Sequence, residues 1–417
     1  MTFNELKICP QILAALDKQG FQAASPIQEQ AIPPILAGKD LLGCAQTGSG
    51  KTAAFAVPIL QILSQKYGKK NAHQTIRSLI LTPTRELAAQ IQDSFQAFGE
   101  RLPFRCGCIL GGVSQKQQER MLANGVDILI ATPGRLNDLI RQNIVDLSQV
   151  EILVLDEADR MLDMGFLNDV KKIISNIRRP KQTLLFSATM PKEISALIDT
   201  ILHDYIKVAV DPVSSAVDAI DQKIYFVDSQ NKKALLLKLL EENHVYAALV
   251  FTRTKRAADI LARELRNADI TAEAIHGNKS QATRQKTLQN FKNGVTQMLV
   301  ATDLAARGID IKGLEYVFNY NLPEEAEMYV HRIGRTGRAG ANGTAISFCN
   351  FEEKTLLPNI EKLAGNNISF IEDHPYPLSD FTVKQRQQGR MKHAPAGKGR
   401  RKNFPAANKN TVKNRCG

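Results

Sequence analysis

Two glycine-rich stretches combine backbone freedom with positive charge, and both are candidates for binding an anion. The first is AQTGSGKT at residues 45–52, and the second is HRIGRTGRAG at 331–340. The second stretch places arginines at positions 332, 335 and 338, and charges so close together repel one another unless an anion lies among them. Because the two stretches are far apart in the sequence, they can serve one anion only if the fold brings them together.

The first stretch has the composition of a phosphate-binding loop. Its glycines let backbone N–H groups curl around phosphates at a helix N-terminus, Lys51 would reach the β- and γ-phosphates, and the Thr52 hydroxyl would ligate Mg²⁺. Ala45 replaces the usual first glycine, but an apolar run precedes the loop and an amphipathic run follows it. A glycine-rich turn with an unrelated lysine is the alternative. The residues expected to bind nucleotide here are Gln46, Thr47, Gly48, Ser49, Gly50, Lys51 and Thr52.

A second set of chemical groups lies in LVLDEAD, residues 153–159. A buried strand that ends in two carboxylates places them at the edge of a sheet, where a metal ion bound to phosphate must be held. Asp156 would hold Mg²⁺, and Glu157 would orient and deprotonate the attacking water. Acidic residues after a strand are more often helix caps. The phosphate-binding loop that precedes them favours the catalytic interpretation.

The elements that position these groups form two successive series of short apolar runs and amphipathic stretches. Such alternation predicts parallel strands with helices between them, and functional loops at the carboxyl ends of the strands. We expect helices at 52–63 and 85–98, and strands at 40–46, 78–84, 127–133, 151–157, 182–189, 247–254, 271–277, 297–303 and 316–323. The predicted fold class is α/β, with two tandem, doubly wound, parallel-sheet domains at 1–210 and 220–372.

The remaining segments are a linker and a basic tail. Residues 211–219 have no helix or strand period, and after residue 372 the apolar periodicity disappears, so we expect a disordered tail at 373–417. The net charge of the chain is +12, and residues 381–417 contain eleven Lys and Arg but no Asp or Glu. The tail is either a solvated appendage or, as we favour, a tether for a polyanion such as RNA.

Bulk properties exclude several classes of protein. No apolar run approaches the ~20 residues that span a bilayer, and the N-terminus is not a signal peptide, so we expect a cytoplasmic protein without a membrane partner. The six cysteines make neither a disulfide framework nor a zinc site. We expect buried, reduced thiols, including Cys106 and Cys108.

DEAD at 156–159 together with AQTGSGKT resembles the DEAD-box ATP-dependent RNA helicases, and GFQAASPIQEQAIP at 20–33 resembles their adenine-recognition motif. The resemblance implies two RecA-like domains with ATP and Mg²⁺ as cofactors. It also implies that Phe21 stacks on the base and Gln28 reads its edge; packing and capping are the alternative roles. Finer matches, such as LDEADRMLDMGF at 155–166, resemble the bacterial RhlE branch.

The other family motifs occur in order along the chain. PTREL (83–87), Gly111-Gly112, TPGR (132–135), FTRTK (251–255), HG (276–277), QATR (281–284) and ATDLAARGID (301–310) resemble the RNA-contact and coupling motifs. The resemblance implies backbone contacts without sequence specificity, and a kinked strand against a helix that begins near Arg135. The implied RNA-binding residues are Thr84, Arg85, Gly112, Thr132, Gly134, Arg135, Arg253, Gly277, Arg284 and Thr302.

The resemblance also assigns the groups that couple ATP to RNA. Ser187 and Thr189 of the SAT sequence should bond to the DEAD segment, Asp159 is a further coupling residue, and Asp310 should contact the ribose. Asp303 and Arg307 should organise the interdomain contact. Arg335 and Arg338 should act as arginine fingers on the γ-phosphate, while His331 and Arg332 tie the closed interface to the DEAD carboxylates and SAT. Singly, each could be a surface ion pair or a loop cap.

We therefore expect a monomeric, RNA-stimulated ATPase that separates RNA strands locally, without processive translocation. It would act on single-stranded or duplex RNA, including ribosomal precursors or RNA-decay complexes, in ribosome biogenesis or RNA degradation. An ATP-gated RNA clamp with little unwinding is the alternative, since it needs the same motifs. A DNA helicase of the same superfamily is a second one.

Overall fold

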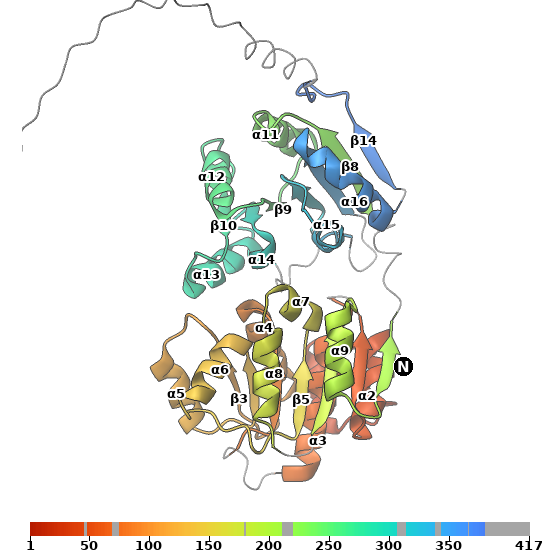
Figure 1. Cartoon of the computed structure of the whole chain (residues 1–417), viewed down its shortest axis with the longest axis vertical. Coiled ribbons are helices and arrows are strands. Elements are labelled where there is room, and N and C mark those ends of the chain that lie inside the picture. The colour runs from red at the N-terminus through yellow and green to blue at the C-terminus, as the bar shows by residue number, and fades with distance from the viewer. Residues whose placement is uncertain are drawn as a thin grey trace, which may run out of the picture.

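The structure is a computed structural model that describes residues 1–45, 48–68, 75–178, 181–210, 220–306, 314–337, 343–365 and 367–379. Two α/β domains follow one another along the chain, in agreement with the predicted fold class (Figure 1). The predicted linker at 211–219 lies outside the described residues. In the described part of the chain, no helix is long and apolar enough to cross a membrane.

The first domain is built on a seven-stranded sheet with the order β3-β4-β2-β5-β6-β1-β7, in which every described strand pair is parallel. Its strands are β1 (Leu41–Cys44), β2 (Ser78–Leu81), β3 (Cys106–Ile109), β4 (Ile128–Ala131), β5 (Ile152–Leu155), β6 (Gln182–Ser187) and β7 (Ile206–Ala209). Its helices are α1 (Pro10–Lys18), α2 (Pro26–Leu36), α3 (Lys51–Tyr67), α4 (Arg85–Phe98), α5 (Gln115–Ala123), α6 (Pro133–Arg141), α7 (Ala158–Asp163), α8 (Leu167–Ser175) and α9 (Lys192–Ile201).

The second domain has a sheet of the same kind, with the order β10-β11-β9-β12-β13-β8-β14. Its strands are β8 (Ile220–Phe226), β9 (Ala248–Phe251), β10 (Ala272–Ile275), β11 (Met298–Ala301), β12 (Tyr316–Asn319), β13 (Gly343–Cys349) and β14 (Ile368–Ile371). Its helices are α11 (Lys232–Glu242), α12 (Lys255–Arg266), α13 (Gln281–Lys292), α14 (Asp303–Ala306), α15 (Ala326–Ile333), η1 (Glu352–Leu356) and α16 (Leu357–Ala364).

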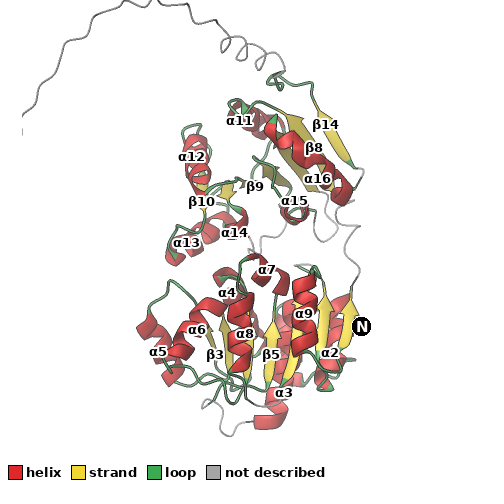
Figure 2. Ribbon diagram, viewed as in Figure 1, coloured by secondary structure: helices red, strands yellow, loops and turns green. Residues whose placement is uncertain are grey.

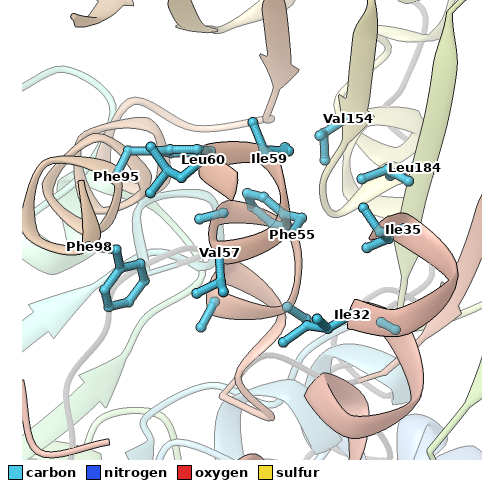
Figure 3. Close-up of a cluster of buried hydrophobic side chains, with 14 of the residues drawn as sticks. Ile32, Ile35, Phe55, Val57, Ile59, Leu60, Phe95, Phe98, Val154 and Leu184 are labelled. Atoms are coloured by element: carbon cyan, nitrogen blue, oxygen red, sulfur yellow. The ribbon is translucent and has the colours of Figure 1, made fainter. Parts of the chain in front are cut away.

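Helices cover the sheets and bury their apolar strands (Figure 2). In the first domain α3 is the central helix of one core. Phe55, Ile59 and Leu60 on α3 pack among side chains of α2, α4 and the strands (Figure 3). Because this helix is buried along most of its length, its N-terminus is held at the carboxyl edge of the sheet. The predicted phosphate-binding loop is therefore attached to one of the best-packed elements of the domain.

Two sequence predictions need correction. Residues 373–379, expected to begin the disordered tail, pack against the second domain: the Ser379 hydroxyl donates to Asp228 at 2.5 Å, and Val227 forms a bridge with Pro377. Residues 380–417 lie outside the described part. Cys106 and Cys108 are half-buried rather than fully buried, and neither is in a disulfide. Burial raises the pKa of Cys108 to about 12, which keeps this thiol protonated.

Candidate nucleotide and RNA sites

The phosphate-binding loop is held in a conformation that requires glycine. Gly48 and Gly50 have φ of 93° and 97°, and a Cβ on Gly50 would lie 2.5 Å from Nε2 of Gln28. Lys51, at the first turn of α3, is only 6% exposed and donates from Nζ to the carbonyl of Ala45 at 3.0 Å. The predicted nucleotide contacts Gln46 and Thr47 lie outside the described residues. The loop therefore has the curled backbone and buried ammonium group that a triphosphate needs.

The adenine-recognition residues make protein contacts in this structure. Gln28 accepts from the backbone N–H of Ser25 at 2.9 Å and donates to the carbonyl of Gly50 at 3.1 Å. The Ser25 hydroxyl donates to the carbonyl of Ser49 at 2.8 Å, and Phe21 packs edge-on against Phe98. These are the capping and packing contacts of the alternative interpretation. They also join the adenine motif directly to the phosphate-binding loop.

Asp156 and Glu157 lie directly after β5, at the same edge of the sheet. Asp156 is 2% exposed and its Oδ1 has no hydrogen-bond partner in the described structure. Burial, together with the neighbouring Glu157 carboxylate, raises the pKa of Asp156 to about 6, although the charges of Lys51 and Arg160 act in the opposite direction. A buried carboxylate oxygen without a protein partner is a suitable ligand for a hard cation. The residues present thus fit the expected Mg²⁺.

Glu157 has a strained backbone and a buried partner. Its φ and ψ of 54° and 53° fall in the left-handed region, which non-glycine residues seldom adopt. Its carboxylate accepts from Nη1 of Arg160 at 2.5 Å, and both side chains are almost completely buried. Such strain persists where the surrounding structure overrides it, and it is concentrated at functional sites.

The predicted bonds between SAT and the DEAD segment are present. Oδ2 of Asp159 accepts from the backbone N–H groups of Ala188 and Thr189 and from the Thr189 hydroxyl, at 2.8–3.1 Å. The backbone N–H of Asp159 donates to the hydroxyl of Ser187 at 3.2 Å. A displacement of the DEAD helix α7 would therefore pull on the loop after β6.

Arg332 differs from its prediction. Its guanidinium is 2% exposed and makes a bidentate ion pair with Asp303 at 2.6 and 2.8 Å, and it donates further to Asn319 and to the carbonyl of Asn321. These partners all belong to the second domain, so Arg332 organises its own domain rather than contacting the DEAD carboxylates here. Asp303, expected at the interdomain contact, supplies the counter-charge.

The nucleotide-facing edges of the two domains meet at a small cavity. Arg160 of the first domain lines it together with Asp303, His331, Arg332 and Arg335 of the second. Arg335 is 4% exposed and lies just after α15. The predicted residues Arg307, Asp310 and Arg338 lie outside the described residues. The fold thus places Arg335, one of the two predicted arginine fingers, at the same cavity as Arg160, which is the ion-pair partner of Glu157.

A larger cavity of about 330 Å³ gathers most of the predicted RNA-binding residues from both domains. Its lining includes seven of the ten: Thr84, Arg85, Thr132, Gly134, Arg135, Gly277 and Arg284. Gly112 is excluded from the lining but lies against Arg85, whose Nη1 would be 2.4 Å from an added Cβ. The helix expected near Arg135 is α6, which starts at Pro133. Sequence reasoning missed Glu86, Met164, Phe166 and Lys279, which also line the cavity.

Arg284 spans the two domains in this structure. Its Nε donates to Oε1 of Glu86 at 2.6 Å, and both side chains are buried. Glu86 is part of the PTREL sequence, but nothing in that sequence indicates a partner 198 residues away.

The two other predicted RNA contacts lie apart from this cavity. Arg253 donates from Nη2 to Glu353 at 3.1 Å, with 44% of its side chain exposed. Thr302 is buried, and its carbonyl accepts from Ala305 and Ala306 at the start of α14. Thr302 therefore caps a helix in this structure.

Comparison with known proteins agrees with this geometry. The family model of the DEAD/DEAH box helicase matches residues 25–197, and that of the helicase conserved C-terminal domain matches 231–340. DEAD-box ATP-dependent RNA helicase RhpA of Helicobacter pylori is 41% identical over 371 residues, covering 89% of this chain and 74% of its own. ATP-dependent RNA helicase DBP2 of Saccharomyces cerevisiae is 45% identical over 375 residues, covering 88% and 68%. The RhlE branch remains a prediction.

Similar solved structures include S. cerevisiae Dbp5 bound to RNA and ADP BeF3. It is 28% identical, with a TM-score of 0.79 over 93% of this chain and 99% of Dbp5. A Dbp5 variant bound to Nup159, Gle1, IP6 and ADP has a TM-score of 0.61, over 92% of this chain and 100% of the variant. The chain belongs to the DEAD-box family of ATP-dependent RNA helicases, enzymes that hydrolyse ATP and bind RNA.

Proposed function

We propose that this helicase separates RNA strands locally, through a cleft whose closure on RNA completes the ATPase site. The observation that carries the proposal is the 330 Å³ cavity, which is lined by predicted RNA-binding residues of both domains. A ligand that fills such a cavity binds best when the domains are closed. Closure also brings Arg335 toward the first domain, so RNA and ATP binding should be positively coupled.

The nucleotide chemistry is divided between the domains. Asp156 and Thr52 would hold Mg²⁺, which neutralises charge on the phosphates when it is bound. Glu157 would accept a proton from the attacking water, and its ion pair with Arg160 keeps the carboxylate oriented. Arg335, together with Arg338, would place its guanidinium on the γ-phosphate. Without the second domain, hydrolysis lacks these cations.

The RNA side of the cavity offers groups that bind sugar and phosphate. Arg85 and Arg135 supply guanidinium groups, Thr84 and Thr132 supply hydroxyls, and Gly134 exposes the backbone at the start of α6. Such groups recognise the backbone of a strand and carry no sequence information. We therefore propose little sequence specificity, and action as a monomer in the cytoplasm on structured RNA.

A short-duplex assay tests the proposal. Wild-type protein with ATP and Mg²⁺ should release the strand of a short RNA duplex, whereas Glu157→Gln should bind ATP and RNA but hydrolyse ATP about 10²–10⁴-fold more slowly, because general-base catalysis is lost. Efficient ATP hydrolysis without strand release would favour the clamp. Stronger ATPase stimulation by single-stranded DNA than by RNA would favour the DNA helicase. A tenfold excess of unlabelled strand serves as a trap, so that single-event release is measured.

A further inference from the structure

A hydrogen-bonded network in the second domain joins the predicted RNA contact Arg253 to the interface arginine Arg332. The residue at which they meet is Asn321, which follows β12. The Oδ1 atom of Asn321 accepts from the backbone N–H of Arg253 at 3.3 Å, and its main-chain carbonyl accepts from Nη1 of Arg332 at 2.6 Å. One residue thus contacts both a strand-end loop assigned to RNA and an arginine that lines the interdomain cavity.

Glu353 completes the network on the side of Arg253. Its Oε1 accepts from Nη2 of Arg253 at 3.1 Å and from Nδ2 of Asn321 at 3.3 Å. Its Oε2 accepts from Nζ of Lys232 at 2.6 Å and from the backbone N–H of Asn350 at 3.1 Å. Glu353 is 2% exposed, so its four bonds fix the carboxylate from all sides. The guanidinium of Arg253 is therefore anchored at one edge.

The anchoring leaves Arg253 available to a ligand. With 44% of its side chain exposed, the guanidinium has donors beyond the one given to Glu353. Lys232, in contrast, is buried and donates to Glu353, to the carbonyl of Tyr320 and to that of Phe348. The buried Lys232 neutralises the Glu353 carboxylate on its interior side, and Arg253 binds the same carboxylate at the protein surface. This arrangement holds one side of a planar cation and presents the other.

We propose that Asn321 is a positioning residue that fixes Arg253 for an RNA phosphate and links that position to Arg332 at the nucleotide interface. The proposal rests on the proposed function and on the predicted contact of Arg253 with the RNA backbone. An amide suits this position because it accepts from Arg253 and donates to Glu353 at once. A carboxylate there would face the carboxylate of Glu353 at hydrogen-bond distance, and an apolar side chain would make neither bond.

The test compares Asn321→Ala with a matched control. Asn243→Ala removes a hydrogen bond of similar kind, from Nδ2 to the carbonyl of Leu239 at 2.8 Å, at the end of α11. We expect Asn321→Ala to raise the RNA KM of the ATPase about tenfold, as the loss of one or two hydrogen bonds would, with kcat at saturating RNA changed less than threefold. Asn243→Ala should leave both unchanged. Asn321→Asp should be at least as harmful as Asn321→Ala.

A double-mutant cycle decides whether the effect passes through Arg253. In the Arg253→Ala background, Asn321→Ala should raise the RNA KM no further, because the residue it positions is gone. Arg253→Lys is a milder change at an exposed position, so it should not impair folding. It should still raise the RNA KM by most of the amount expected for Arg253→Ala. An unchanged RNA KM in Asn321→Ala, or full additivity of the two changes, would overturn the proposal.

Direct RNA binding separates this proposal from the proposed function. Fluorescence anisotropy with a labelled single strand, with and without a non-hydrolysable ATP analogue, should show that Asn321→Ala weakens RNA binding in both conditions, because the substitution removes the amide bonds to Arg253 and Glu353 but keeps the main-chain carbonyl that Arg332 contacts. If the wild-type protein binds RNA in this Asn321-dependent way but separates no strands, the proposed function fails and the positioning role stands. If strands are separated normally while Asn321→Ala binds RNA like wild type, the positioning role fails.

Discussion

The two domains share one topology but complete their functional edges differently. The strand order of the second sheet is that of the first with seven added to each strand number, so equivalent strand ends lie at equivalent places. At the end of β5 in the first domain, Asp156 has an oxygen without a partner and Glu157 a strained backbone. In the second domain, Arg332 and Arg253 have carboxylate partners of their own.

This difference indicates how one fold serves two tasks. The first domain holds an anionic edge that a ligand must complete, and it bears the cost of burying a carboxylate without a hydrogen bond at one oxygen. The second domain holds cations in place before any ligand arrives, since its own carboxylates and carbonyls orient them. Substitution of the buried carboxylates after β5 should therefore act mainly on chemistry, whereas loss of the buried Arg332 of the second domain should act mainly on stability. Arg335, at the boundary, should act on chemistry.

The largest effect is expected for Arg335→Ala. If its guanidinium acts on the γ-phosphate after closure, RNA-stimulated hydrolysis should fall about 10³–10⁵-fold, while ATP binding to the RNA-free protein stays near normal. Single-turnover hydrolysis at saturating RNA, with binding of a fluorescent ATP analogue as control, measures both. Hydrolysis within tenfold of wild type would show that the finger assignment is wrong.

Arg332→Ala should lower the free energy of unfolding, because this arginine is held by partners within its own domain. Its removal leaves Asp303 without its bidentate partner and opens the space beside Phe251, over whose ring the guanidinium lies 5.0 Å from the centroid. Arg332 is buried but Asp303 is 32% exposed, so the loss should cost no more than the about 3–5 kcal/mol of a fully buried pair. Urea unfolding followed by circular dichroism measures the change. Arg253→Ala, at a more exposed ion pair, is the control and should cost about 1 kcal/mol or less.

Asp156→Asn should stabilise the protein in the absence of Mg²⁺ and nucleotide. The pKa of Asp156 is about 6 in the folded protein against 3.8 for a free side chain, so the folded state favours the protonated form. This contribution to stability is present below about pH 4 and is lost as the pH rises through 6. The variant should therefore gain about 1–3 kcal/mol at pH 8, and the gain should vanish at pH 4. Urea titrations in EDTA at both pH values measure it, and an equal gain at both would contradict the assignment.

Much of the fold could be predicted because its central strands are continuous apolar runs. β5 is ILVL, buried throughout, and each of the nine predicted strand ranges contains an observed strand. Five strands lie outside the predicted ranges: β3, β7, β8, β13 and β14. β7 and β14 are edge strands, where exposed positions such as Ile206 and Phe370 break the expected pattern, and the interior strand β8 carries polar residues such as Asp221 between its apolar ones. Periodicity reports burial, and an edge strand is buried too little to produce it.

The candidate site was predictable where a motif is local. The loop from Gly48 to Lys51 needs its own glycines and the following helix, and both are adjacent in sequence. Partners of the arginines were not predictable, because ion pairs such as Arg253–Glu353 join residues 100 positions apart and depend on the packed fold. The motifs therefore identify which side chains matter, while the tertiary structure decides which of them are engaged with protein.

The smallest effect is expected at the ion pair between Arg284 of the second domain and Glu86 of the first. In this structure Nε of Arg284 and Oε1 of Glu86 are 2.6 Å apart, and both residues line the larger interdomain cavity. If the pair supports closure, Glu86→Gln and Arg284→Gln should each weaken the coupling between RNA and ATP binding about 5–10-fold, at the lower end of the 1–3 kcal/mol typical of coupling energies. The double variant should be little worse than either single one. If Arg284 instead binds RNA directly, Arg284→Gln alone should weaken RNA binding in the absence of nucleotide, and Glu86→Gln should strengthen it by removing a nearby anion. RNA titrations with and without an ATP analogue distinguish these outcomes.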